Sequence, residues 1–247
     1  MMTARTLLVR GMLVGVVAGL LAVAFSSLFG EPQINNAIAY EAAHTPPGDH
    51  EHELVSRTLQ ATVGLAVAVL VYGAALGGVF GLAFAFAYGR LGRLGARPTA
   101  LLVAAVGFVA VYAAPFVKYP ASPPAVGNPD TIGRRTALYF LMIVVSVAVA
   151  IVATLVGRSL NRRLDTWTAS LVAVAVFVAV VALAGLVLPA VDEVPGDFSA
   201  TLLWRFRLAS LGTQLVLWTT FGLLFGALTE RSLRRQADKT PQAAAVG

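Results

Sequence analysis

The feature of this sequence that most limits its fold is the recurrence of long apolar segments. Six such segments run through the chain, at residues 7–29, 61–88, 98–117, 136–157, 166–191 and 208–229. A helix of roughly 20 apolar residues covers the hydrocarbon core of a bilayer, which is about 30 Å thick. With 58% hydrophobic and 12% charged residues, the chain has more apolar surface than a soluble domain could bury. We therefore predict an all-α, multi-pass protein of the cell membrane, built as a bundle of six transmembrane helices.

The charges of the loops predict an orientation for this bundle. If the six segments cross the membrane in turn, 12 of the 18 Lys and Arg residues share a side with the N-terminus. Nine of the 12 acidic residues fall on the opposite side. Because Lys and Arg concentrate in short cytoplasmic loops, we predict that both termini are cytoplasmic and that the acidic loops lie outside. The net charge of +6 then reflects topology, and we do not expect binding to nucleic acid.

The apolar segments leave no room for a separate soluble domain. We predict one transmembrane domain over residues 1–235 and a disordered cytoplasmic tail over 236–247. The first segment is too long for a typical signal peptide and favours a retained helix, with cleavage after residues 22–24 as the alternative. Glycines recur at four-residue spacing, which predicts that helix backbones approach one another closely in lipid. They are Gly11, Gly15 and Gly19, then Gly73, Gly77 and Gly81, then Gly222 and Gly226.

All three histidines of the chain lie in one predicted outer loop, surrounded by carboxylates. Imidazole and carboxylate groups together suit divalent first-row metals, and the absence of cysteine excludes thiolate sites. Alternate residues of an extended segment point the same way, so His50 and His52 could share one ion. We predict that the loop captures a metal through His44, His50, His52, Asp49, Glu51 and Glu53. The alternative is a solvated acidic loop in which the histidines bind nothing.

The connection between the third and fourth segments contains five prolines between residues 115 and 136. Each proline fixes its own φ angle and restricts the residue before it, so the connection should hold a defined shape. It could frame the outer mouth of a pathway, or it could be a structural strap over the bundle. The residues leave both interpretations open.

Polar side chains enter the sixth segment on one helical face, because Arg207, Ser210 and Gln214 are spaced at i, i+3 and i+7. Polar groups at membrane depth are costly unless they face a cavity or a partner. Arg205 and Arg207 could instead form structural ion pairs with Asp192, Glu193 or Glu31. Our candidates for a pathway or a gate are Gln60, Lys118, Arg205, Arg207, Ser210 and Gln214.

No residue combination in the sequence predicts catalysis. A membrane-embedded enzyme would need a nucleophile with a base, or a carboxylate pair, at membrane depth, and neither can be placed. The glycine-rich stretch 89–95 follows a membrane segment and lacks the strand that a phosphate-binding loop requires. We therefore predict no catalytic residue, no bound cofactor and no enzyme, with an intramembrane enzyme kept only as an alternative.

Five stretches of the chain resemble the CbtA family of predicted cobalt transporter subunits. They are FGEPQI at 29–34, VSRTLQ at 55–60, PFVKYP at 115–120 with PPAVGNPDTI at 123–132, LPAVDEVP at 188–195 and LWRFRLASLGTQLVLW at 203–218. The resemblance implies uptake of cobalt, linked to vitamin B12 metabolism. It also implies a small partner, CbtB, with one membrane helix and a histidine-rich, metal-binding end.

The resemblance supplies no ligand set, so the site residues above rest on the residue pattern alone. Nitrogen and oxygen ligands discriminate weakly among divalent metals, and cobalt is favoured over nickel, zinc or copper only by the resemblance. Besides lipid and the CbtB-like subunit, a homo-oligomer is the other partner we consider. A non-transporting membrane scaffold or metal chaperone is the main alternative to a transporter subunit.

Overall fold

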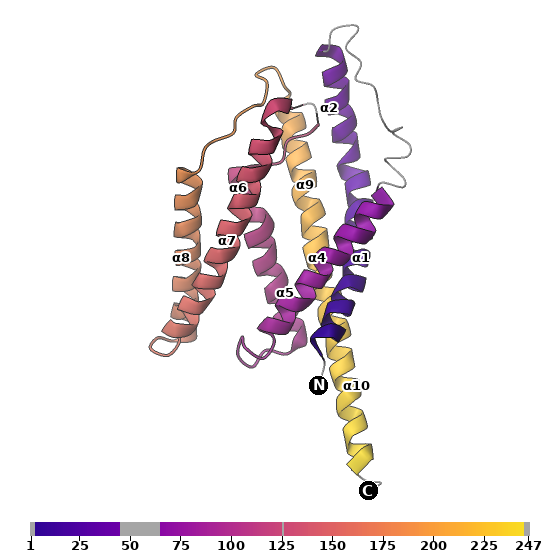
Figure 1. The fold of residues 1–247 in the computed structure, drawn as a ribbon, viewed down its shortest axis with the longest axis vertical. Helices are drawn as coiled ribbons and strands as arrows, with labels where there is room; N and C mark the ends of the chain where they lie inside the picture. The colour runs from indigo at the N-terminus through magenta and orange to yellow at the C-terminus, as the bar shows by residue number, and fades with distance from the viewer. Residues whose placement is uncertain (1–2, 45–64, 125, 245–247) are drawn as a thin grey trace. The chain divides into compact units, whose positions relative to one another are not determined.

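In the computed structural model, which describes residues 3–44, 65–124 and 126–244, every regular element of those residues is helical (Figure 1). Six of the described helical segments are long and apolar enough to cross a membrane. They are Ala4–Phe29, Val69–Ala87, Ala96–Lys118, Pro129–Leu160, Thr166–Val187 and Ala200–Asp238. These segments confirm the predicted six-helix, all-α class and a multi-pass membrane protein.

Two of the spans are made of consecutive helical pieces that include a π-helix. The third joins α5 (Ala96–Gly107), the π-helix η2 (Phe108–Ala113) and α6 (Ala114–Lys118). The sixth joins α9 (Ala200–Thr220), the π-helix η4 (Phe221–Phe225) and α10 (Gly226–Ala244). The remaining helices are α1 (Ala4–Phe29), α2 (Glu31–His44), α4 (Leu65–Ala87), the short 3-10 helix η3 (Pro129–Thr131), α7 (Ile132–Leu160) and α8 (Thr166–Val187).

Some helix ends differ from those expected from hydropathy. The sixth helix was predicted to begin at residue 208 but begins at Ala200. The charges near Trp204 and Arg205 lower the hydropathy of this stretch, although its backbone is helical. The fifth ends at Val187, before the residue 191 predicted, since the residue before Pro189 is disfavoured in a helix. The start of the predicted second helix, 61–64, lies outside the described residues. Helix α10 continues to Ala244, through part of the segment that the sequence assigns to a tail.

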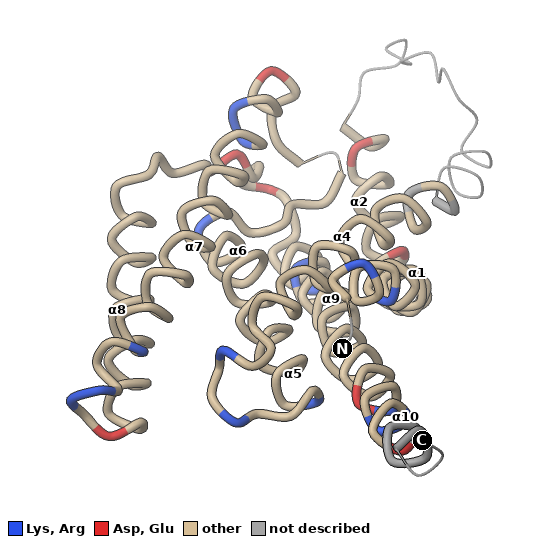
Figure 2. Tube along the Cα trace, turned by 60° about the horizontal axis from the view of Figure 1, so that its bottom comes forward, with Lys and Arg blue, Asp and Glu red and all other residues tan. Residues whose placement is uncertain are grey.

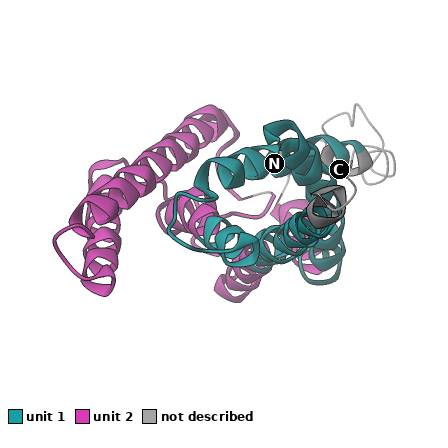
Figure 3. Ribbon diagram, turned by 90° about the horizontal axis from the view of Figure 1, so that it is seen from below, with its two compact units in different colours: residues 1–31, 45–105, 212–247 teal, residues 32–44, 106–211 magenta. Residues whose placement is uncertain are grey.

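The chain divides into two compact units, coloured separately in Figure 3. Unit 1 contains residues 1–31, 45–105 and 212–247, and unit 2 contains residues 32–44 and 106–211. The predicted single domain over residues 1–235 stays a prediction beside this division.

Unit 1 is held together by the close packing of α1 on α4. A Cβ atom built at Gly15 would overlap the carbonyl oxygen of Gly73, and one built at Gly73 would lie 2.7 Å from the carbonyl oxygen of Gly15. Gly11 and Gly77 exclude a side chain from each other's position in the same way. The backbones therefore touch where only glycine fits, which confirms the predicted role of these residues in helix packing.

Aromatic rings contribute a further part of the core of unit 1. Phe80 of α4 stacks on Phe221 of η4 with ring centroids 5.0 Å apart, and Phe84 meets Phe225 edge-on at 5.0 Å. Near the N-terminal end of α1, the Arg10 guanidinium donates to the Thr229 hydroxyl at 3.0 Å and to the Ser232 hydroxyl at 2.7 Å. These bonds fix the start of α10 against α1.

In unit 2, α7 and α8 form an antiparallel hairpin. The turn between them ends at Asp165, whose carboxylate caps α8 by accepting the Thr168 amide at 3.0 Å. The hydroxyl of the fully buried Ser146 in α7 is shared between the carbonyl of Met142, at 2.8 Å, and the carbonyl of Ala110 in η2. Figure 2 shows basic residues in this turn, and likewise in the connection between α4 and α5 of unit 1.

Candidate functional site

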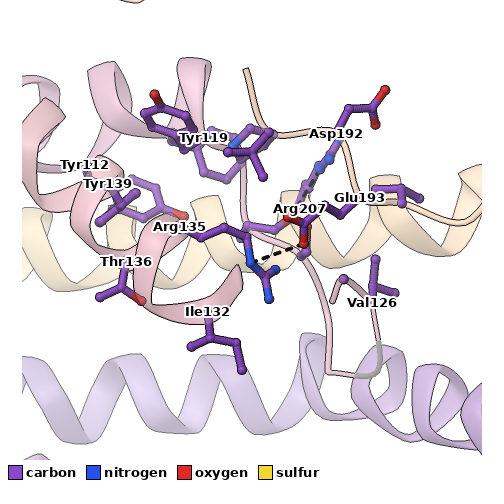
Figure 4. Close-up of a pocket in the computed structure, with 17 residues that line it drawn as sticks. Tyr112, Tyr119, Val126, Ile132, Arg135, Thr136, Tyr139, Asp192, Glu193 and Arg207 are labelled. Carbon is purple, nitrogen blue, oxygen red and sulfur yellow. Dashed lines mark hydrogen bonds and ion pairs between the residues drawn. The ribbon is translucent and has the colours of Figure 1, made fainter. Parts of the chain in front are cut away.

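A cavity of about 480 Å³ in unit 2 lies between the proline-rich connection and the loop after α8 (Figure 4). Side chains of η2 and α6, among them Tyr112 and Phe116, form one wall. The first turns of α7 contribute Arg135, Thr136 and Tyr139. Residues 191–194 and Arg207 of α9 complete the lining. Two connections far apart in the sequence, the proline-rich connection and the loop after α8, thus meet at one space.

Glu193 joins these two connections. Its Oε2 atom accepts the Thr131 hydroxyl at 2.8 Å and the Asn128 backbone amide at 3.0 Å, and lies 3.4 Å from Nε of Arg135. These groups lower the pKa of Glu193, with the Thr131 hydroxyl as the largest cause and Arg135 as a smaller one. The carboxylate is therefore ionised at neutral pH, and it ties the loop after α8 to the proline-rich connection.

Arg135 is held by a second contact that depends on a glycine. Its Nη2 atom donates to the Asn128 carbonyl at 3.2 Å, and its guanidinium lies against Gly127. Gly127 has a φ of +110°, which residues other than glycine rarely adopt. A Cβ atom at this position would also lie 2.5 Å from Nη1 of Arg135. Glycine at this position therefore allows the backbone to turn and leaves space for the Arg135 guanidinium.

Two further bonds hold the proline-rich connection at the cavity. The buried Tyr119 donates its hydroxyl to the Pro189 carbonyl at 2.9 Å. Burial raises the pKa of Tyr119, so this phenol remains a proton donor. Arg207 donates from Nε to the Ala121 carbonyl at 3.2 Å. The proline-rich connection is thus bonded to the rest of unit 2 at several points along its length.

The lining of the cavity combines phenol groups, carboxylates and guanidinium groups. Its basic side chains are Arg135 and Arg207, and its acidic side chains are Asp192 and Glu193. Within the described part of the chain, no group of three His, Cys, Asp or Glu side chains could hold a metal ion. An ion in this space would meet oxygen atoms and water rather than a closed set of protein ligands.

A second polar cluster lies at the C-terminal end of α2, also in unit 2. The Nε2 atom of His44 is 3.2 Å from Oδ2 of Asp197, and its Nδ1 atom is 2.8 Å from the carbonyl oxygen of Tyr40. The Tyr40 hydroxyl donates to Oδ1 of Asp197 at 2.8 Å. This bond is the largest cause of the lowered pKa of Asp197.

The predicted site residues divide among several places. Of the pathway and gate candidates, Arg207 lines the cavity, whereas Lys118 lies over the Tyr119 ring at 5.7 Å and Arg205 is exposed on α9. Ser210 and Gln214 are half-buried on α9 and are not part of the cavity lining. Gln60 and the loop residues Asp49, His50, Glu51, His52 and Glu53 lie outside the described residues.

Sequence reasoning missed Arg135 and Asp197. Ion pairs of Arg205 and Arg207 with Asp192, Glu193 or Glu31 were one alternative from the sequence. In the structure Arg135 lies beside Glu193, while Arg207 donates to a backbone carbonyl. The basic pair 134–135, which directly follows the NPDT stretch at 128–131, is the one signal in the sequence that could have indicated Arg135.

Comparison with known proteins identifies a family for the chain. A family model described as "Probable cobalt transporter subunit (CbtA)" matches residues 4–230. No curated protein and no solved structure gives a significant match. The matched residues include α1 to α9 and both connections that meet at Glu193. The chain therefore belongs to the CbtA family of probable cobalt transporter subunits.

Proposed function

We propose that this chain is the membrane-spanning subunit through which Co²⁺ enters the cell, in an uptake system linked to vitamin B12 metabolism. The metal is first captured by the acidic loop with His44, His50, His52, Asp49, Glu51 and Glu53. One observation carries this proposal beyond the family description: His44, at the head of that loop, directs a ring nitrogen at the Asp197 carboxylate. Nitrogen and oxygen donors of this kind suit a divalent first-row metal.

The proposed direction of transport follows from the charges of the loops. We place both termini in the cytoplasm and the acidic loops outside, where they raise the local concentration of cations. An inside-negative potential favours entry by about 2.3 kcal/mol per elementary charge per 100 mV. Because arginine repels a cation, Arg135 and Arg207 act as organisers of the cavity wall, and the ion passes the phenol and carbonyl oxygens of the cavity.

A subunit acts with partners. We propose that a small CbtB-like protein with one membrane helix and a histidine-rich end supplies metal ligands that the described residues do not bring together. The chain then serves transport rather than catalysis, with cobalt as its cargo.

Replacing His44, His50 and His52 together with alanine tests the capture loop. At submicromolar metal we expect uptake of radiolabelled Co²⁺ to fall by about tenfold or more, because loss of metal-site residues weakens binding on this scale. At saturating metal the defect should shrink, since the loop concentrates the ion and does not form the pathway. The matched control replaces the exposed Asn35 and Asn36 of α2 with alanine. Uptake that is unchanged at every Co²⁺ concentration would remove the loop from the mechanism.

A further inference from the structure

We infer that Asp197 is a metal ligand, and that it binds the same divalent cation as His44. This inference rests on the proposed function, because the capture loop supplies both the metal and the histidine. Asp197 lies in the loop between α8 and α9, far from the histidines in sequence, and the residue pattern gives it no role. Its carboxylate nevertheless lies where a second ligand to a metal on His44 would lie.

The hydrogen bonds of the His44 ring define which nitrogen is free for a metal. Nδ1 lies 2.8 Å from the Tyr40 carbonyl oxygen, which can only accept, so Nδ1 carries a hydrogen. Nε2 lies 3.2 Å from Oδ2 of Asp197, and an ionised carboxylate also only accepts. In the neutral ring, two lone pairs would therefore face each other across this gap. A cation between Nε2 and Oδ2, either a proton or a metal ion, removes the repulsion.

The separation of these two atoms fits a shared metal ion. Nitrogen and carboxylate oxygen ligands lie about 2.1 Å from a first-row divalent metal. Two such ligands at an angle of about 90° to 110° are then about 3.0 to 3.4 Å apart. The observed separation of 3.2 Å falls within this range, so both side chains could bind one ion from their present positions.

The neighbours of the pair hold it in the orientation that a metal site requires. The Tyr40 hydroxyl occupies Oδ1 of Asp197 and leaves Oδ2 toward His44. The Tyr40 ring packs edge-on against Phe198 at 4.9 Å, and Phe198 is buried with Ala37 and Val126. Metal-binding histidines commonly donate their second nitrogen to a carbonyl group, as His44 does to Tyr40.

The pair is also open to ions from solution, since the side chains of His44 and Asp197 are 53% and 62% exposed. The described residues provide these two ligands and no third side chain of the metal-binding types. Water is the donor that would complete the coordination. The site is therefore an entry point that binds metal reversibly rather than a closed structural site.

Because the chain has three histidines, labelling them with ¹⁵N yields a spectrum with three imidazole groups. In full-length protein in lipid nanodiscs, replacing His50 and His52 with alanine leaves His44 as the single reporter. Co²⁺ should perturb the His44 signals of this variant. Adding Asp197→Asn should weaken Co²⁺ binding by about tenfold or more, while Tyr40→Phe, which loses only the positioning hydroxyl, should weaken it less. Asp130→Asn, at an exposed carboxylate in η3, is the matched control and should leave the affinity unchanged.

The signals of the metal-free variants show whether the His44 bond to Tyr40 is intact, so a folding defect is distinguished from the loss of a ligand. If Asp197→Asn binds Co²⁺ as tightly as Asp130→Asn does, Asp197 is not a ligand and the inference fails. The proposed function survives that result if His50 and His52 of the unmodified chain still respond to Co²⁺. If none of the three histidines responds, the inference and the capture loop are both wrong.

Discussion

A leucine at Gly77 is expected to abolish the close packing of α1 on α4 and to leave little folded protein. Even a Cβ atom at this position would overlap the carbonyl oxygen of Gly11 and lie 2.7 Å from Cα of Gly15. Both groups belong to the backbone, so they cannot turn aside as a side chain could. Overpacking a core costs about 1 to 3 kcal/mol when side chains can adjust, and a whole leucine against backbone should cost more. Whole proteins are stable by only about 5 to 15 kcal/mol.

The smaller change Gly77→Ala should lower the midpoint of thermal unfolding by several degrees, because about 1 kcal/mol shifts a chain of this size by roughly 2 to 4 °C. The midpoint of thermal unfolding of both variants is measured from the fraction of monodisperse protein that remains after heating in detergent. Gly185 of α8 provides the control, since an added Cβ atom there has no neighbour within 4 Å. If Gly77→Leu and Gly185→Leu unfold at the same temperature, close backbone packing does not stabilise unit 1.

Replacing Glu193 with alanine should separate the proline-rich connection from the loop after α8 and abolish most Co²⁺ uptake. The change removes the acceptor for the Thr131 hydroxyl and the Asn128 amide, and it takes away the carboxylate that pairs with Arg135. Removing one partner from a partly buried polar network leaves the others unsatisfied. Hydrogen exchange of residues 119–131 should become faster, because local opening no longer breaks these bonds.

Two companion variants distinguish loss of the contacts between Glu193 and the proline-rich connection from loss of a negative charge alone. Gly127→Ala keeps Glu193 but displaces the Arg135 guanidinium, so it should loosen the same segment. Asp130→Ala removes an exposed carboxylate from the same connection and should have little effect. The pKa of Glu193 is lowered from 4.5. The contacts of this carboxylate with the proline-rich connection should therefore persist at neutral pH and weaken only as the pH falls through that lowered value. Unchanged exchange of residues 119–131 in Glu193→Ala would contradict this account of the cavity wall.

The membrane helices were predictable from the sequence because a single physical property, burial of apolar residues in lipid, determines them. Their ends were less predictable. Helix α9 begins at Ala200 because residues such as Arg205 and Arg207 continue the helix although they lower its hydropathy. The glycine spacing indicated close packing, but it could not show that Gly15 would face Gly73, since that pairing depends on tertiary structure.

The polar contacts of the site were mostly beyond sequence reasoning. Glu193 lies 62 residues from Thr131 and 65 from Asn128 in the chain, and several arginines were available as its partner. The choice of Arg135 depends on the turn at Gly127, which places the guanidinium beside the carboxylate. Asp197 lies 157 residues from Tyr40, and nothing in its local sequence distinguishes it from other loop carboxylates. His44 was a candidate from the sequence because all the histidines cluster in one short segment, and its role in metal binding stays a prediction.

Transport of Co²⁺ by this chain is the central claim, and flux into liposomes tests it most directly. The purified chain is reconstituted alone and together with the proposed CbtB-like, single-helix protein, an inside-negative potential is applied, and entry of radiolabelled Co²⁺ is measured. We expect accumulation above that of protein-free liposomes in at least the preparation that contains both proteins, and a loss of that accumulation in Glu193→Ala. If Co²⁺ enters neither preparation faster than protein-free liposomes, the chain is a scaffold or a metal chaperone and not a transport subunit.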